Sequence, residues 1–158
     1  MTAFARTSSS LALILCLCAV LPSAASGRAA DAPRPMRGTC DTTFVFTSPT
    51  ALHIEGTCHF LHLGLTTLVA EQTLNPIDPT TVRITNTAVY TAANGDELHA
   101  SFTGMGTFGP SGVTFSGTET FSGGTGRFLH VLGRMTDVGT ANPDAGIGQF
   151  TGDGSIVY

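Results

Sequence analysis

Residues 82–122 read VRITNTAVYTAANGDELHASFTGMGTFGPSGVTFSGTETFS, and this stretch decides the fold class. It is rich in Thr, Val and Phe, the β-branched and aromatic residues that favour strands over helices. Asn94-Gly95 is the strongest short hairpin signal, because both central positions of that turn need a positive φ. The turn sequence GPSG at 109–112 follows one strand later. The stretch therefore predicts three antiparallel strands joined by two tight turns.

The same pattern continues on both sides of this stretch. Gly and Pro make up 27 of the 158 residues and Thr another 25, so the chain is a poor helix former. We expect eight strands, at 40–46, 52–63, 65–74, 82–92, 96–108, 113–122, 127–138 and 146–158. The chain has no Lys and only 11% charged residues, so few charged side chains would protect an exposed edge strand from pairing with another chain. We predict an all-β, eight-stranded antiparallel closed barrel, with a sandwich as the alternative.

Residues 1–30 differ from the rest and predict an export signal. A single charge at Arg6 precedes the apolar run LALILCLCAVL at 11–21, and PSAAS at 22–26 supplies a helix breaker and small side chains. The eleven apolar residues are fewer than the roughly 20 that a membrane helix needs. We expect a cleaved signal peptide at 1–30. Three cleavage positions fit the pattern: after Ala25, Ser26 or Ala30.

The mature chain is acidic and of single-domain size. We expect a flexible lead-in at 31–38 and one barrel domain at 39–158, in a secreted or periplasmic protein. All eleven acidic residues but only five Arg lie beyond the signal, which gives a mature net charge of −6. No basic cluster occurs, which argues against nucleic acid as a partner and against membrane binding after signal cleavage. No pattern in the sequence defines an oligomeric state.

Cys40 and Cys58 are the two cysteines of the mature chain. A hairpin centred on Pro49 places them directly opposite each other on neighbouring strands. An even pair in an exported protein is typical of a disulfide, and closing this loop contributes roughly 3 kcal/mol. A metal or redox role is the alternative, but the chain has no CxxC motif to support it. We therefore predict a Cys40–Cys58 disulfide and no metal site.

Three short motifs lie at the predicted turns: HLGLTT at 62–67, AANGDEL at 92–98 and GGTGRFLHVLG at 123–133. Their sequences and their order resemble the barrel family of plant allene oxide cyclases and dirigent proteins, together with its secreted bacterial relatives. With the strand count, the resemblance covers most of 40–158. It implies an eight-stranded antiparallel barrel of the calycin-like, allene oxide cyclase-like kind. It leaves the activity open, since members range from true cyclases to dirigent proteins that steer a coupling reaction without catalysing it.

The strands at 113–122 and 127–138 hold the most suggestive polar cluster. If the GGTG turn pairs Ser122 with Arg127, Glu119 lies opposite His130 among aromatic side chains. Desolvation in such a place shifts pKa values and favours acid–base catalysis. The alternative is an ion pair near the barrel mouth without a catalytic role. We expect Glu119 and His130 as catalytic residues, and as ligand-binding residues Phe60, Phe115, Phe121, Phe128, Leu132 and Arg134.

His62 is the third candidate catalytic residue. On the strand at 52–63 it shares one face with the apolar Ile54 and Phe60 and should point inward. There it would act as an acid, a base or a donor, or, in the alternative, form a core contact with a neighbour. The Asn94-Gly95 turn places Tyr90 opposite His99, which we interpret as ordinary cross-strand packing.

The inner face predicts a binding function more clearly than a reaction. An apolar surface with a few polar groups is the usual composition of a ligand site, so we expect a small, largely apolar ligand in the lumen. A cyclase, isomerase or dirigent-type protein that shapes a flexible substrate inside the barrel is the first alternative, and whether the chain is an enzyme stays open. A packed barrel acting through its surface is the second, because eight strands enclose an interior that is either filled or hollow. No phosphate loop, HExxH or nucleophile elbow occurs, so we expect no cofactor.

Overall fold

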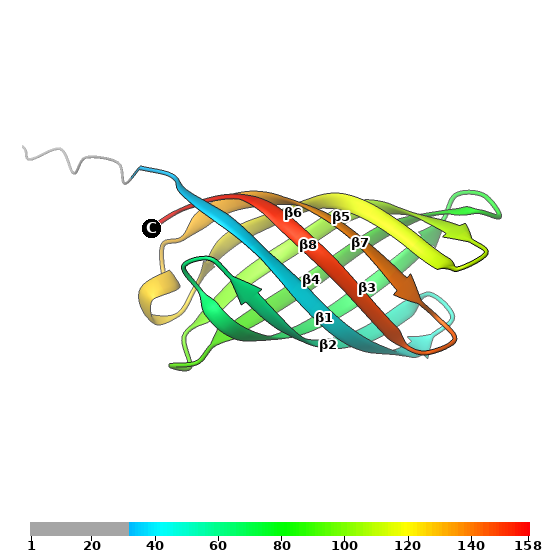
Figure 1. The fold of residues 1–158 in the computed structure, drawn as a ribbon, viewed down its shortest axis with the longest axis horizontal. Helices are drawn as coiled ribbons and strands as arrows, with labels where there is room; N and C mark the ends of the chain where they lie inside the picture. Colours follow the sequence, from blue (N-terminus) through cyan, green and yellow to red (C-terminus); the bar gives the residue numbers. More distant parts are fainter. Residues whose placement is uncertain (1–31) are drawn as a thin grey trace, which may run out of the picture.

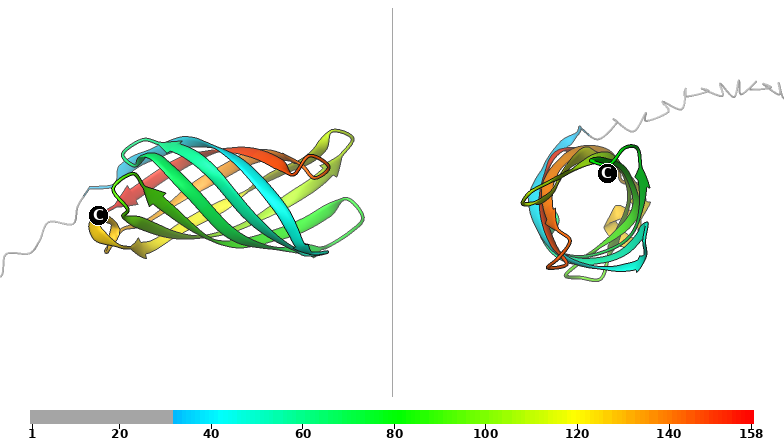
Figure 2. Two further views of the ribbon diagram at one scale, coloured as in Figure 1. Left: turned by 90° about the horizontal axis from the view of Figure 1, so that it is seen from below. Right: turned by 90° about the vertical axis from the view of Figure 1, so that its right-hand side faces the viewer.

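Eight strands, each paired antiparallel with the next, wind around a common axis in the computed structural model, which describes residues 32–158 (Figure 1). The elements are β1 Arg34–Ser48, β2 Ala51–Phe60, β3 Gly64–Pro76, β4 Thr81–Ala92, β5 Glu97–Gly109, β6 Gly112–Gly124, η1 Gly126–Phe128, β7 Leu132–Asn142 and β8 Ile147–Val157. β8 pairs back with β1 and closes the barrel, so the predicted fold class is confirmed (Figure 2). The expected signal peptide lies outside the described residues. Within residues 32–158, no helix has the length and apolar character needed to cross a membrane.

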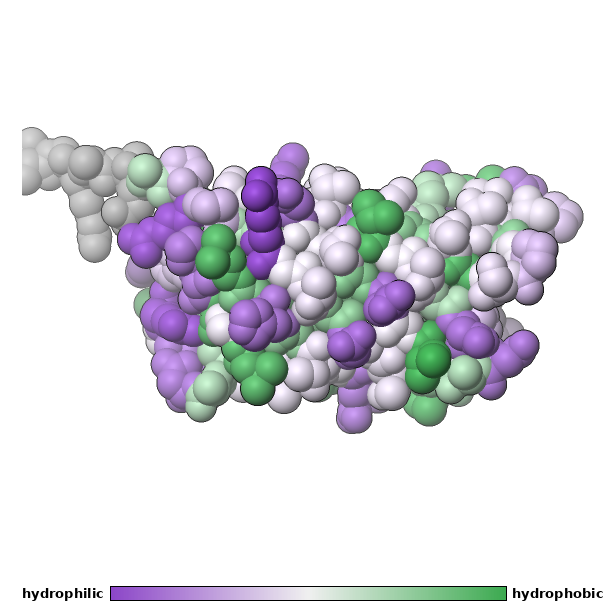
Figure 3. Space-filling model, in the orientation of Figure 1, coloured by the Kyte–Doolittle hydropathy of each residue, from purple (hydrophilic) through white to green (hydrophobic). Residues whose placement is uncertain are grey.

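Alternation along the strands separates an apolar inner face from a hydrated outer face. On β5, Leu98 and Phe102 point inward and are at most 4% exposed. Their neighbours Ser101 and Thr103 point outward and are exposed. The outer face shown in Figure 3 mixes polar and charged side chains with isolated apolar ones. Thr suits such a face, because its branched carbon favours a strand while its hydroxyl stays in water. The high Thr content is therefore a property of the outer wall.

η1 and the C-terminus lie at the same end of the barrel (Figure 1). Buried side chains fill this end. The β6–β7 connection folds inward and buries Phe128 completely, beside Leu63 from the β2–β3 turn at 5% exposure. The guanidinium of Arg127 donates a hydrogen bond to the carbonyl oxygen of Leu63 at 3.3 Å. The backbone N–H of Arg127 donates to the Asp96 carboxylate at 3.2 Å. These contacts tie three connections together and close this end.

The Cys40–Cys58 disulfide joins β1 and β2, as the hairpin register predicts. Both cysteines are 1% exposed and lie on the inner face. A disulfide of this kind is compatible with an extracellular or periplasmic protein. The first strand, however, begins earlier than expected. Arg34–Gly38 belong to β1 and pair with β8, so the prediction of a flexible lead-in is wrong for these residues. Closure explains the difference, since β8 extends to Val157 and needs a partner along its length.

Candidate functional site

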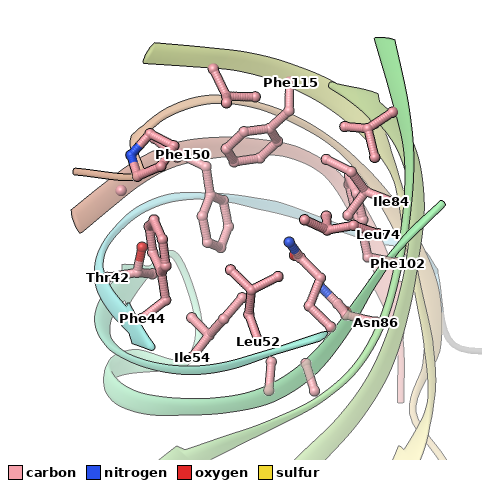
Figure 4. Close-up of a pocket in the computed structure, with 18 of the residues that line it drawn as sticks. Thr42, Phe44, Leu52, Ile54, Leu74, Ile84, Asn86, Phe102, Phe115 and Phe150 are labelled. Carbon is pink, nitrogen blue, oxygen red and sulfur yellow. The ribbon is translucent and has the colours of Figure 1, made fainter. Parts of the chain in front are cut away.

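The half of the barrel away from η1 contains a cavity of about 340 Å³. All eight strands contribute lining side chains, and the lining reaches the rim at Pro49, Pro76 and Pro143. Its walls are mainly apolar (Figure 4). Six of the lining residues are phenylalanines: Phe44, Phe46, Phe102, Phe108, Phe115 and Phe150. The volume lies within the range of small-molecule sites, which begins at about 300 Å³.

Glycines on the inner face make room for these rings. A Cβ added at Gly117 would lie 2.5 Å from Cζ of Phe102, and one at Gly139 would lie 2.5 Å from Cζ of Phe115. Real side chains do not approach that closely, so each ring occupies space that a side chain at the facing glycine would need. Phe102 and Phe115 also pack edge to face, with ring centroids 6.3 Å apart. The rings are therefore held against the wall, and the space beside them stays open.

Three polar side chains form the deep end of the cavity: Tyr90 on β4, Glu119 on β6 and Asp137 on β7. We call them the acidic floor. Tyr90 is 1% exposed, and its hydroxyl lies 2.9 and 2.8 Å from the two carboxylate oxygens of Glu119, to which it donates. The Tyr90 ring packs edge to face on Phe60 and Phe121 below it. These contacts fix the orientation of Glu119 toward the lumen.

Burial changes the acidity of all three floor residues. Glu119 is 2% exposed, and desolvation raises its pKa to about 7 against the opposing effect of the Tyr90 hydrogen bond. Asp137 is 3% exposed, and desolvation together with the nearby charge of Glu119 raises its pKa to about 8. Burial and the Glu119 charge also raise the Tyr90 pKa well above its ordinary value. At pH 7 the carboxyl pair therefore retains a proton and carries less than two full negative charges.

Two buried oxygen atoms of residues that line the cavity have no hydrogen-bond partner within the described protein. Oδ1 of Asp137 and Oδ1 of Asn86 are buried without a hydrogen-bond partner, and both residues line the cavity. The Tyr90 hydroxyl is already engaged with Glu119. Among the described residues that line the cavity, none is Arg, Lys or His. A buried oxygen without a protein partner is unfavourable, so a ligand that donates hydrogen bonds suits this end of the cavity.

The predicted Glu119–His130 pair is wrong. Glu119 is buried on the floor, but it lies opposite Met135, and His130 is exposed in the β6–β7 connection. The GGTG segment does not form a tight turn from Ser122 to Arg127. The chain instead continues through η1 and reaches β7 only at Leu132. The Asp96 carboxylate lies against Gly126, in the space that a side chain there would need, and helps to set this longer path.

Of the predicted ligand-binding residues, Phe115 alone lines the cavity. Leu132 is 62% exposed and Arg134 is also exposed on the outer face, which contradicts their expected inward position. The remaining three are fully buried in the packed core near the closed end rather than at the cavity: Phe60, Phe121 and Phe128. They support the floor from below but do not line the cavity.

His62 does not point into the lumen. β2 ends at Phe60, and His62 is exposed in the following turn with a φ of 71°. Tyr90 faces Leu98 rather than His99, because the four residues 93–96 connect β4 to β5, with a positive φ only at Gly95. The prediction of ordinary cross-strand packing for Tyr90 is thus wrong.

Sequence reasoning missed Tyr90 and Asp137 as floor residues. Tyr90 shares its parity with the apolar Ile84 and Ala88 on one strand, and that signal was available. No such signal marked Asp137, since its orientation depends on a register set by the β6–β7 connection. No group of metal-ligating side chains suited to an ion occurs in residues 32–158. No protein-family model matches the chain, and no curated protein matches it.

Proposed function

We propose that the mature chain is a secreted or periplasmic barrel that binds a small, largely apolar molecule in its lumen. The cavity of about 340 Å³, walled by apolar side chains and reaching the barrel rim, is the observation that carries this proposal. It also weighs against a packed barrel acting only through its surface. The likeness of the three turn motifs to allene oxide cyclase-like barrels supports the same proposal. The Cys40–Cys58 disulfide agrees with export.

The cavity sets the size of the ligand. A cavity of about 150 Å³ holds benzene, so one of 340 Å³ accommodates about 14 non-hydrogen atoms. Each methylene group buried there gains about 0.8 kcal/mol from leaving water. A single alkyl chain of about ten carbons therefore has both the size and the apolar surface for measurable binding.

Binding of 1-decanol, measured by calorimetry, tests the proposal. Ala70 lines the cavity at 3% exposure, and Ala70→Leu adds three carbon atoms to the lumen. Val69, the preceding residue, is 45% exposed on the outer face, and Val69→Leu is the matched control. We expect Ala70→Leu to weaken decanol binding at least about tenfold and Val69→Leu to leave it unchanged. Failure of the wild-type protein to bind decanol, or equal binding by both variants, contradicts the proposal.

The acidic floor supports a second candidate, a cyclase or isomerase that folds a flexible substrate in the lumen. A carboxyl group whose pKa is about 7, oriented by Tyr90, can exchange a proton near neutral pH. A turnover assay on a flexible polyunsaturated substrate tests this candidate. Glu119→Gln should abolish turnover while retaining decanol binding, and His130→Ala should leave turnover unchanged. Unchanged turnover in Glu119→Gln eliminates the acid–base role.

Export and signal cleavage can be tested by determining the N-terminal residue of the exported protein. The N-terminal residue of the protein recovered outside the cytoplasm should be Ser26, Gly27 or Asp31, as cleavage at the three expected positions requires. An exported chain that still begins at Met1 contradicts a cleaved signal.

A further inference from the structure

We infer that the ligand carries a protonated amine, and that the lumen binds a lipophilic amine with its ammonium group at Glu119 and Asp137 and its alkyl part among the phenylalanine rings. This inference rests on the proposed lumen function and names the chemical class of the ligand. It comes from three features of the cavity: unpartnered acceptors, an absence of cationic lining residues in the described chain, and aromatic walls.

The buried oxygen atoms without a hydrogen-bond partner favour a ligand that donates hydrogen bonds. Asp137 is 97% buried, and its Oδ1 has no hydrogen-bond partner, and neither does Oδ1 of Asn86 at the cavity wall. Glu119 receives one hydrogen bond, from Tyr90, although a carboxylate accepts several. An ammonium group offers three donors and no acceptor. It therefore matches oxygens that an alcohol, with a single donor, serves only in part.

The charges of the lining residues also favour a ligand with an ammonium group. Two carboxyl groups lie in one apolar enclosure, and no lining residue among those described supplies a positive charge. On the strands that flank Glu119, the facing side chains are Phe102 on β5 and Met135 on β7, with Tyr90 one strand further on β4. Asp137 is thus the other ionisable acid beside it. A ligand cation compensates the carboxylate charge that the protein itself leaves unbalanced.

The walls favour a cation as well. Aromatic faces attract an ammonium group more strongly when water is excluded. Tyr90 belongs to the floor, and the ring of Phe102 lies on the strand next to Glu119. A ligand carboxylate would instead be repelled by either floor acid whenever that acid is ionised. The site therefore discriminates against fatty acids and in favour of amines of the same length.

Proton release is a distinct signature of this mode. Burial makes both carboxyl groups hold protons more tightly than usual, and an arriving ammonium group favours their ionised forms. Decylamine affinity should therefore rise between pH 6 and pH 8.5, with protons released to the buffer. The alkylammonium group itself stays charged over this range. Decanol affinity should not follow this pattern.

Calorimetry with decylamine, 1-decanol and decanoate tests the inference. We expect decylamine to bind the wild-type barrel about tenfold or more tightly than decanol, and decanoate to bind more weakly than either. The double variant Glu119→Gln/Asp137→Asn should lose this preference while keeping its affinity for decanol. Ala70→Leu should weaken both decylamine and decanol, which separates lumen binding from attraction to the acidic outer surface.

The outcomes distinguish this inference from the function on which it rests. Decanol binding as tight as decylamine binding in the wild-type protein overturns the amine inference and leaves lumen binding intact. A preference for decylamine that persists in the double variant also overturns it. If the double variant fails to fold, the wild-type pH dependence decides, since an affinity independent of pH contradicts ion pairing at the floor. Absence of binding by all three probes refutes lumen binding and the amine inference together.

Discussion

Replacement of Glu119 by Gln should make the barrel less sensitive to alkaline pH. Gln has nearly the shape of a protonated Glu, and its side-chain oxygen can accept the hydrogen bond from Tyr90. It cannot ionise. The variant therefore removes the charge from the floor while preserving its packing and its contact with Tyr90.

The magnitude follows from the pKa of Glu119 in the folded barrel. The value rises from 4.5 to about 7, so the folded state holds the proton that the unfolded chain releases. The associated stability is fully present below about pH 4.5 and is lost as the pH rises through 7. At about 1.4 kcal/mol per pH unit, ionisation of Glu119 removes about 3 kcal/mol from the free energy of unfolding. Asp137, whose pKa is about 8, adds to the loss in the same direction.

Urea unfolding between pH 5 and pH 9, at constant ionic strength and with the disulfide intact, measures the effect. The stabilities of wild type and Glu119→Gln should differ by less than about 1 kcal/mol at pH 5 and by about 3 kcal/mol at pH 9, with the variant more stable. Asp78 and Asp96 have lowered pKa values, so their contribution is lost only at lower pH. Between pH 5 and pH 9, changes in the free energy of unfolding therefore report on groups whose pKa is higher in the folded state than in the unfolded chain.

Glu55→Gln is the matched control for this experiment. Glu55 is 70% exposed on the outer face of β2 and lies 3.5 Å from His53, whose pKa is raised chiefly by its hydrogen bond with Glu71. A raised His pKa also gives stability that is lost with rising pH, but this exposed group contributes little. Glu55→Gln should therefore follow the wild-type profile. If Glu119→Gln also parallels wild type across the range, Glu119 is not a buried carboxyl with a raised pKa.

Three further outcomes test other parts of the fold. Replacement of Cys40 and Cys58 by Ala should lower the free energy of unfolding, measured in urea, by about 3 kcal/mol, because the two cysteines are 18 residues apart and their disulfide closes the loop between them. An unchanged free energy of unfolding would contradict a structural disulfide. Phe128→Ala should cost about 3 to 5 kcal/mol, because a fully buried ring at the closed end is lost, and a loss below about 1 kcal/mol would mean that this end is not packed. His130→Ala should change the free energy of unfolding by less than about 0.5 kcal/mol, because His130 is exposed in a connection, and a larger loss would contradict that position.

The strands and their number could be predicted from the sequence because both depend on local patterns. Extended runs of β-branched and aromatic residues are separated by Gly, Pro and Asn, and these signals act within a few residues. The disulfide register followed from one short hairpin, in which Cys40 and Cys58 lie at equal distances from the turn. Closure followed from the lack of residues that protect open edges.

The side of the barrel that each side chain faces could not be predicted across a longer connection. Between β6 and β7, an inferred tight turn placed even-numbered β7 residues inside. The actual path through η1 places the odd-numbered ones inside, including Asp137. A change of this kind moves every side chain of a strand to the opposite face. Arg134 left the predicted site for this reason and Asp137 entered it, whereas His130 left because it lies in the connection itself.

The proposed binding function accounts for the acidic floor, whereas selection for stability alone does not. Two ionisable acids buried within one apolar enclosure destabilise the folded state as the pH rises, and apolar residues of similar volume would fill the same space without that penalty. Below the floor, Phe60, Phe121 and Phe128 pack a closed core. Above it, rings over glycines leave the lumen open. An open cavity and a buried oxygen without a hydrogen-bond partner do not help a barrel that is selected only for stability. A barrel selected to bind an apolar ligand that donates hydrogen bonds requires both the cavity and the acceptor oxygen.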